Sequence, residues 1–112
     1  MIESTLFFPL ICAVLAALGM PLWVAMVGPN RLYGVHTAAT LADESLWYAV
    51  NRATGRDIVA AGTVSLALAV LLPKMGLEGV AYALLMTGAL ASSGALVAVI
   101  ALARIRHLRS PL

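Results

Sequence analysis

Three long stretches without a charged side chain constrain this chain more than any other feature. They run from Thr5 to Val27, from Ile58 to Leu72 and from Gly79 to Ala103. As a helix, the first would measure roughly 34 Å, enough to cross a bilayer, and the third is longer still. The second would measure only roughly 22 Å, but the bilayer can thin locally around a short span. The sequence therefore predicts an all-helical membrane protein with three spanning helices.

The overall composition agrees with a lipid environment. Hydrophobic residues make up 62% of the 112 residues, and charged residues only 11%, whereas a soluble domain has about 25% charged residues. Seven basic and five acidic side chains are too few to cover the surface of a soluble domain. The net charge of +2, with no basic stripe, argues against nucleic acid as a partner.

A cleaved signal peptide is the alternative interpretation of the first stretch. Such a peptide has a basic leader and a short apolar core. Here the leader is Met-Ile-Glu, in which Glu3 is the only charged residue, and the apolar run continues well past a normal signal core. We therefore expect this segment to remain as the first spanning helix.

The basic residues indicate an orientation. Six of the seven lie either between the first two stretches or after the third, and the single lysine, Lys74, lies in the remaining connection. Basic residues concentrate in cytoplasmic loops. We expect a multi-pass protein of the inner cell membrane, with its amino terminus outside and its first loop and carboxyl terminus in the cytoplasm.

The expected organisation is a single membrane domain over residues 1–112, with a short helix in the first loop. The spans cover about 5–27, 57–73 and 79–103, the loop covers 28–56, and a basic tail covers 104–112. Thr40 and Asp43 have the spacing of a capping box, and Gly55 suits the residue that follows a helix. These signals predict a loop helix over 41–54.

The pattern within this loop helix predicts what it contacts. Leu46, Trp47, Val50 and Ala53 share one face, so the helix should lie in the membrane interface or against the bundle, with Trp47 as its anchor. Asn51 lies one turn after Trp47, and we expect its side chain to bond a neighbouring backbone, such as the turn at Gly34.

Small residues indicate where helices approach each other closely. They occur in the second stretch and in the third, where Gly88 and Ser92 share a face. Such a face serves packing within one chain or a homo-oligomer, and the sequence leaves both open.

The loop also resembles a known family. Tyr33-Gly34-Val35-His36-Thr37, followed by Thr40-Leu41, Trp47, Asn51 and Gly55-Arg56, resembles the signature of the SdpI-like family, and Pro29-Asn30-Arg31 fits as well. These small bacterial membrane proteins are named for the immunity protein of a sporulation-delaying toxin. One position departs from the family pattern, which most often has arginine where this chain has His36.

The resemblance implies a non-enzymatic protein that binds a peptide toxin or a cytoplasmic regulator, for immunity or signalling. It requires no cofactor or metal. The candidate binding residues are Arg31, Tyr33, His36, Thr37, Trp47, Asn51 and Arg56.

Two other classes of function remain open from the sequence. One is a small oligomeric transporter or channel, although none of the three stretches contains an ionisable group of the kind that ion-coupled carriers use. The other is an enzyme at the membrane interface, which would need His36 together with Asp43 or Glu44 in a polar cleft. Neither a nucleophile elbow nor a metal-ligand spacing occurs in the sequence.

Overall fold

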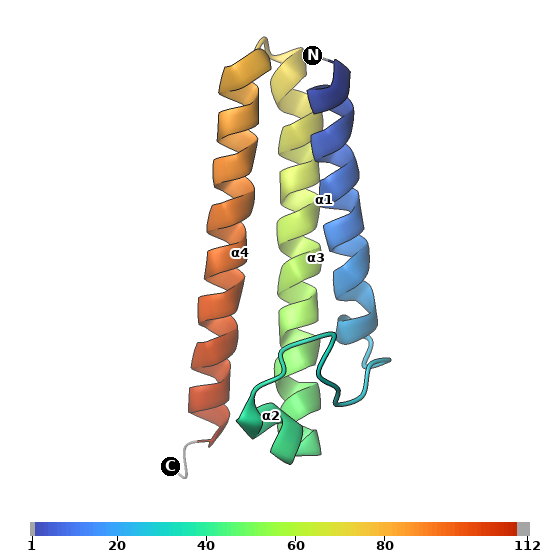
Figure 1. Ribbon diagram of the computed structural model, residues 1–112, viewed down its shortest axis with the longest axis vertical. Helices are drawn as coiled ribbons and strands as arrows, with labels where there is room; N and C mark the ends of the chain where they lie inside the picture. The colour runs from blue at the N-terminus through green and yellow to red at the C-terminus, as the bar shows by residue number, and fades with distance from the viewer. Residues whose placement is uncertain (1, 110–112) are drawn as a thin grey trace.

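The fold is a bundle of three long helices, here described from a computed structural model over residues 2–109. Helix α1 covers Ile2–Trp23, α3 covers Glu44–Lys74 and α4 covers Gly79–Arg109, while the short α2 covers Ala38–Ala42 (Figure 1). The three long helices are each long and apolar enough to cross a membrane. The expected fold class, three spanning helices with a short helix in the first loop, is confirmed.

The bounds of the loop helix differ from the prediction. Residues 44–54, expected to form a separate helix, are the first turns of α3, which continues without a break through Gly55. The separate short helix is α2, which lies before them. Helix α3 measures roughly 46 Å, well beyond the hydrocarbon thickness of about 30 Å, so it extends out of the membrane.

Local hydrogen bonds explain where α2 and α3 begin. Thr37 caps α2 and forms a reciprocal capping box with Thr40, in place of the predicted pairing of Thr40 with Asp43. Asp43 instead caps α3, because its carboxylate accepts a hydrogen bond from the Leu46 backbone N–H at 3.2 Å. Glu44 follows in the first turn, where a negative charge stabilises the helix dipole.

The other helix ends differ from the expected bounds by a few residues. Helix α1 ends at Trp23 rather than near residue 27. Helix α3 ends at Lys74, and the turn that follows contains Gly76 with a φ of +97°. Residues 104–109 of the predicted tail are the last turns of α4, and positions 110–112 lie outside the described residues.

Helices α1 and α3 pack closely along their length because glycines remove the side chains between them. A Cβ on Gly55 would lie 2.4 Å from the Trp23 backbone nitrogen, and a Cβ on Gly62 would lie 2.8 Å from the Ala16 nitrogen. Gly19 faces Gly55 across the same contact. Small residues in the second span thus serve packing within the chain, as in many membrane bundles.

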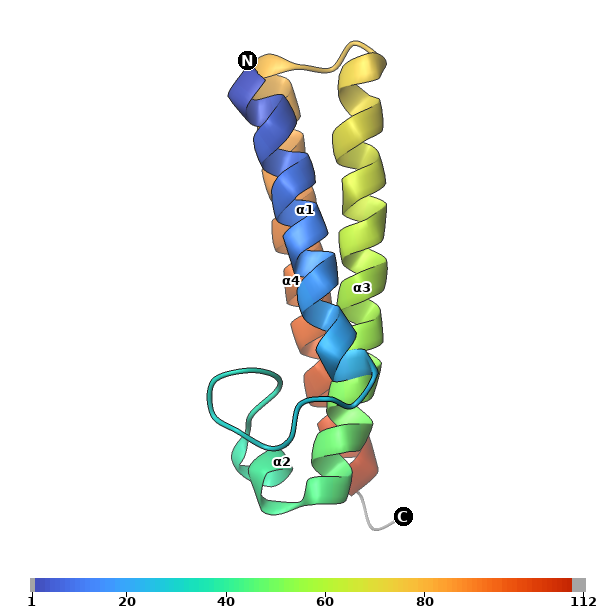
Figure 2. The same ribbon diagram turned by 90° about the vertical axis from the view of Figure 1, so that its right-hand side faces the viewer.

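Helix α4 is attached to the rest of the bundle mainly near its two ends. Near its start, Tyr82 and Met86 pack with Phe8, Cys12 and Ala69 in one fully enclosed cluster. Near its end, Ile105 packs with Leu46 and Val50 of α3. Between these clusters α4 and α1 are separated: in the view of Figure 1 α3 lies between them, and in the turned view of Figure 2 α1 lies in front of α4.

Two small residues of α4, Gly88 and Ser92, do not pack within the chain. Gly88 and Ser92 are exposed, and a Cβ on Gly88 would meet no atom within 4 Å. Their shared face therefore points away from the bundle.

Candidate functional site

The loop between α1 and α3 is held by the side chain of Asn51. Its Oδ1 accepts a hydrogen bond from the Val35 N–H at 2.6 Å, and its Nδ2 donates to the Val35 carbonyl at 3.3 Å and to the Trp47 carbonyl at 3.0 Å. The predicted hydrogen bond between Asn51 and the turn at Gly34 is thus confirmed, and its backbone partner is Val35, one residue after Gly34. Gly34 has a φ of +102°, and a Cβ there would lie 2.7 Å from Asn51 Oδ1, so only glycine fits.

Two aromatic residues tie the same loop to α1. The Trp47 indole N–H donates to the Val27 carbonyl at 2.8 Å, and the Tyr33 hydroxyl donates to the Leu18 carbonyl. Trp47 is fully buried. Of the two positions predicted for the helix face that carries Trp47, the structure shows the one against the bundle, because the indole lies inside the protein and its N–H bonds the chain.

His36 and Thr37 complete the turn before α2. His36 is exposed, and its Nδ1 lies 2.9 Å from the Gly34 carbonyl oxygen, at hydrogen-bond distance. The Thr40 hydroxyl, one turn on, donates to the Val35 carbonyl at 2.9 Å. These bonds are local, so they fix the shape of the turn.

The predicted site residues therefore fall into two groups. Tyr33, His36, Thr37, Trp47 and Asn51 meet in this hydrogen-bonded loop, which we call the signature loop (residues 33–37 with Trp47 and Asn51). Arg31 and Arg56 are exposed outside it.

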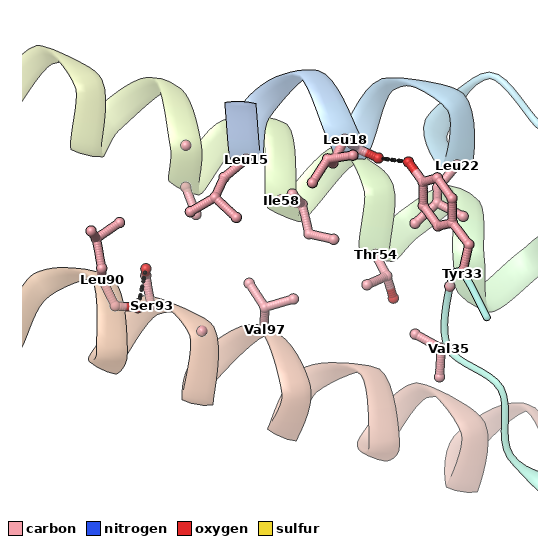
Figure 3. A pocket seen from close by; sticks show the side chains of 14 residues that line it. Leu15, Leu18, Leu22, Tyr33, Val35, Thr54, Ile58, Leu90, Ser93 and Val97 are labelled. Carbon is pink, nitrogen blue, oxygen red and sulfur yellow. Dashed lines mark hydrogen bonds between the residues drawn. The ribbon is translucent and has the colours of Figure 1, made fainter. Parts of the chain in front are cut away.

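An apolar groove lies directly beside the signature loop, between α1, α3 and the middle of α4 (Figure 3). Its volume is about 400 Å³, within the range of small-molecule sites. Tyr33, Gly34 and Val35 close one end. The remaining wall is formed by Leu15, Leu18, Leu22, Thr54, Ile58, Ala61, Gly62, Leu90, Ser93, Gly94 and Val97.

The groove contains one polar atom without a partner. Thr54 is 3% exposed, and its hydroxyl is the only buried side-chain oxygen or nitrogen among the described residues that makes no hydrogen bond. Figure 3 shows the side chain pointing into the space that Val35 and Val97 face from other sides. A buried hydroxyl without a partner costs about 1–3 kcal/mol. The other hydroxyl of the wall, on Ser93, donates to Leu90 of its own helix.

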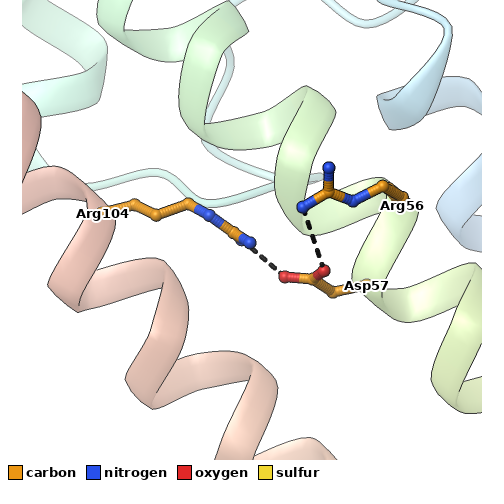
Figure 4. A network of polar contacts seen from close by, with 3 residues as sticks. All are labelled: Arg56, Asp57 and Arg104. Carbon is orange, nitrogen blue, oxygen red and sulfur yellow. Dashed lines mark hydrogen bonds and ion pairs between the residues drawn. The ribbon is translucent and has the colours of Figure 1, made fainter.

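A charged contact joins α3 and α4 at the Arg-rich end of the bundle. Arg104 donates to Asp57 at 2.5 Å, and Arg56 lies 3.6 Å from the other carboxylate oxygen (Figure 4). Arg104 and Asp57 are each about a fifth exposed, which strengthens their attraction relative to open water. This pair holds the end of α4 in place beside the groove.

The arrangement around the remaining polar residues offers little for chemistry. Asp43 is engaged as a helix cap, and Glu44 is exposed. Within the described part of the chain, no three His, Cys, Asp or Glu side chains gather as metal ligands do.

Sequence patterns did not reveal the groove or Thr54. Thr54 occupies an ordinary position in a helix, and only the separation of α1 from α4 leaves its hydroxyl facing a cavity. The nearest signal in the sequence is Gly55, which follows Thr54 directly and which suits a helix end.

Comparison with known proteins supports the resemblance of the loop. Neither the curated proteins nor the solved structures gave a match. A family model described as the SdpI/YfhL protein family matches residues 26–104, which include the signature loop, α3 and most of α4. Since this match covers well over half of the chain, the protein belongs to the SdpI/YfhL family.

Proposed function

We propose that this membrane protein binds a hydrophobic, membrane-active peptide in the groove beside the signature loop, and so provides immunity or signals the presence of the peptide. The observation that carries the proposal is the unpaired, buried Thr54 hydroxyl in an otherwise apolar groove. The immunity role of the protein for which the family is named supports this class of ligand. We further propose that the action is non-enzymatic; the family is not a known enzyme family.

The groove suits a side chain of such a peptide better than a whole helix. One turn of a helix, about 10–12 Å wide and 5.4 Å long, fills roughly 400–600 Å³, so the whole cavity of about 400 Å³ is no larger than a single turn. A peptide lying against α1 and α4 would insert an apolar side chain and offer a backbone or side-chain polar group to Thr54. Because the bonds of the signature loop keep this end of the groove closed, the shape exists before the peptide arrives, which lowers the entropic cost of binding.

We propose that the signature loop lies on the cytoplasmic side of the inner membrane. The Arg-rich end of the bundle, with Arg31, Arg52 and Arg56 on one side and the end of α4 on the other, supports this orientation by the positive-inside rule. A reporter that functions only in the cytoplasm should be active when it is fused after Leu112. Activity of a reporter that functions only outside the cytoplasm would contradict the orientation.

Replacing Thr54 by valine should weaken protection without weakening the fold. Valine has nearly the same shape as threonine but lacks the hydroxyl, so the unpaired polar atom disappears and the free energy of unfolding stays equal or rises by up to about 2 kcal/mol. The peptide, in contrast, loses its hydrogen-bond partner. We expect cells with the variant to depolarise faster under a membrane-active peptide than cells with the unchanged protein.

The measurement is membrane depolarisation in a sensitive bacterium, with and without the protein, at equal membrane abundance. Thr63→Val is the matched control, because Thr63 is on the same helix and exposed. Full protection by Thr54→Val would show that the hydroxyl does not contact the peptide. Failure of the unchanged protein to protect against any peptide would contradict the proposed function itself.

A further inference from the structure

A second hollow, between the end of α1 and the first turns of α3, is lined by side chains of a different kind. Trp23, Ala49, Arg52, Ala53 and Arg56 enclose a cleft of about 310 Å³. Arg52 and Arg56 stand one turn apart on α3 and are both exposed. Ala49 and Ala53 contribute only small side chains to the lining.

The charge of this cleft is positive. No carboxylate lines it. The nearest acid, Asp57, lies 3.6 Å from Arg56 but is bound more closely by Arg104, at 2.5 Å. The charge of Arg56 is therefore only partly offset by Asp57, which already pairs with Arg104, and Arg52 adds a second positive charge. Each guanidinium group carries several N–H donors in one plane, and two such groups one turn apart match the oxygens of a phosphate.

The surroundings of the cleft identify the source of that phosphate. Trp23 is the last residue of α1 and is 41% exposed, as expected of a tryptophan at the level of lipid headgroups. Its neighbours Met20 and Val24 are large, apolar and about half exposed, so acyl chains can lie along α1 below the cleft.

We propose that the Trp23–Arg52–Arg56 cleft binds the phosphate headgroup of an anionic phospholipid. The arginines hold the phosphate, the indole covers the glycerol region, and the acyl chains follow the outer face of α1. This site is separate from the groove, which lies between α1 and α4, and its test does not involve a peptide. A bound lipid would brace the contact between α1 and α3 at the end where the chain leaves the membrane.

Quenching of tryptophan fluorescence by brominated lipids tests the proposal. The full-length protein is placed in vesicles that contain brominated phosphatidylglycerol or brominated phosphatidylcholine, and Trp23→Phe gives the contribution of the buried Trp47 alone. We expect phosphatidylglycerol to associate at Trp23 roughly tenfold more strongly than phosphatidylcholine, since both arginines attract an anionic headgroup and salt screens only part of that attraction.

Three variants distinguish a specific lipid site in the cleft from general attraction between positive charges of the protein and the anionic membrane. Arg52→Gln with Arg56→Gln should remove the preference, whereas Arg106→Gln with Arg109→Gln removes the same charge elsewhere and should leave it. Ala49→Leu fills the cleft without a change in charge and should also remove the preference. Equal quenching by the two lipids, an equal loss in both double variants, or full preference in Ala49→Leu would overturn the proposal. If inorganic phosphate, added at matched ionic strength, abolishes the preference for phosphatidylglycerol, the cleft binds free phosphate instead.

Discussion

Replacing Gly55 by alanine is expected to force α1 and α3 apart and to destabilise the protein by about 3 kcal/mol, the upper end of the usual cost of overpacking. The new methyl group would lie 2.4 Å from the Trp23 backbone nitrogen and 2.6 Å from the Gly19 carbonyl oxygen. Both neighbours are backbone atoms, which cannot rotate away as a side chain can. The helices must therefore separate along the whole contact, which also moves the end of α1 that the signature loop bonds.

The matched control for this prediction is Gly88→Ala. Gly88 is also helical, but a Cβ there would meet no atom within 4 Å. The free energy of unfolding should stay equal or rise by up to about 1 kcal/mol, because alanine favours a helix more than glycine does. Unfolding of the purified proteins in mixed micelles checks the pair. Equal stability of the two variants would show that the close approach at Gly55 is not required.

Replacing Trp47 by alanine is expected to cost about 3–5 kcal/mol and to release the signature loop. Trp47 is fully buried, and its indole N–H donates to the Val27 carbonyl at 2.8 Å. Its removal leaves a large cavity beneath Gly34 and an unpaired carbonyl in the segment that leaves α1. The end of the groove formed by Tyr33, Gly34 and Val35 would then lose its support.

Trp23→Ala is the control, because it removes a side chain of the same size. Trp23 is 41% exposed and accounts for much less buried surface. Its replacement should therefore destabilise the protein by less than half as much in the same micelles. If both variants unfold at the same denaturant concentration, the signature loop does not depend on the buried indole.

The sequence predicted the arrangement of the chain wherever one physical requirement dominates. Apolar stretches of sufficient length must span the bilayer, so three of the helices were expected. The contact between Asn51 and the Gly34 turn was also expected, because a polar side chain on the packed face of a helix needs a backbone partner. Of the four residues predicted to share one face, Leu46, Trp47 and Val50 are buried, whereas Ala53 is half-buried and lines the cleft with Arg52 and Arg56.

Residues that can serve two purposes explain the errors. A glycine after a helical pattern suits a helix end, but Gly55 lies inside α3, where it allows α1 to approach. A tryptophan beside a membrane span suits either the interface or the bundle; Trp47 is buried in the bundle, and the exposed Trp23 fits the interface. Only contacts between distant segments distinguish these alternatives.

The residues that identify the family have mainly structural tasks in this chain. Gly34, Trp47, Asn51 and Gly55 fix the loop and the contact between α1 and α3. The proposed ligand site lies next to them rather than among them, in the groove that they help to close. A loop with this signature would therefore preserve the shape of the groove while its apolar wall could vary.

Binding of a peptide in the groove is tested most directly by filling the groove at Gly94. This residue lines the groove, and a Cβ there would meet no atom within 4 Å, so the side chain of Gly94→Leu starts in open space beside the groove. Gly88→Leu, on the outer face of the same helix, is the control. Against the peptide from which the unchanged protein protects, depolarisation should return to the unprotected rate with Gly94→Leu and stay slow with Gly88→Leu. Equal protection by both variants, at equal membrane abundance, would contradict the groove as the binding site.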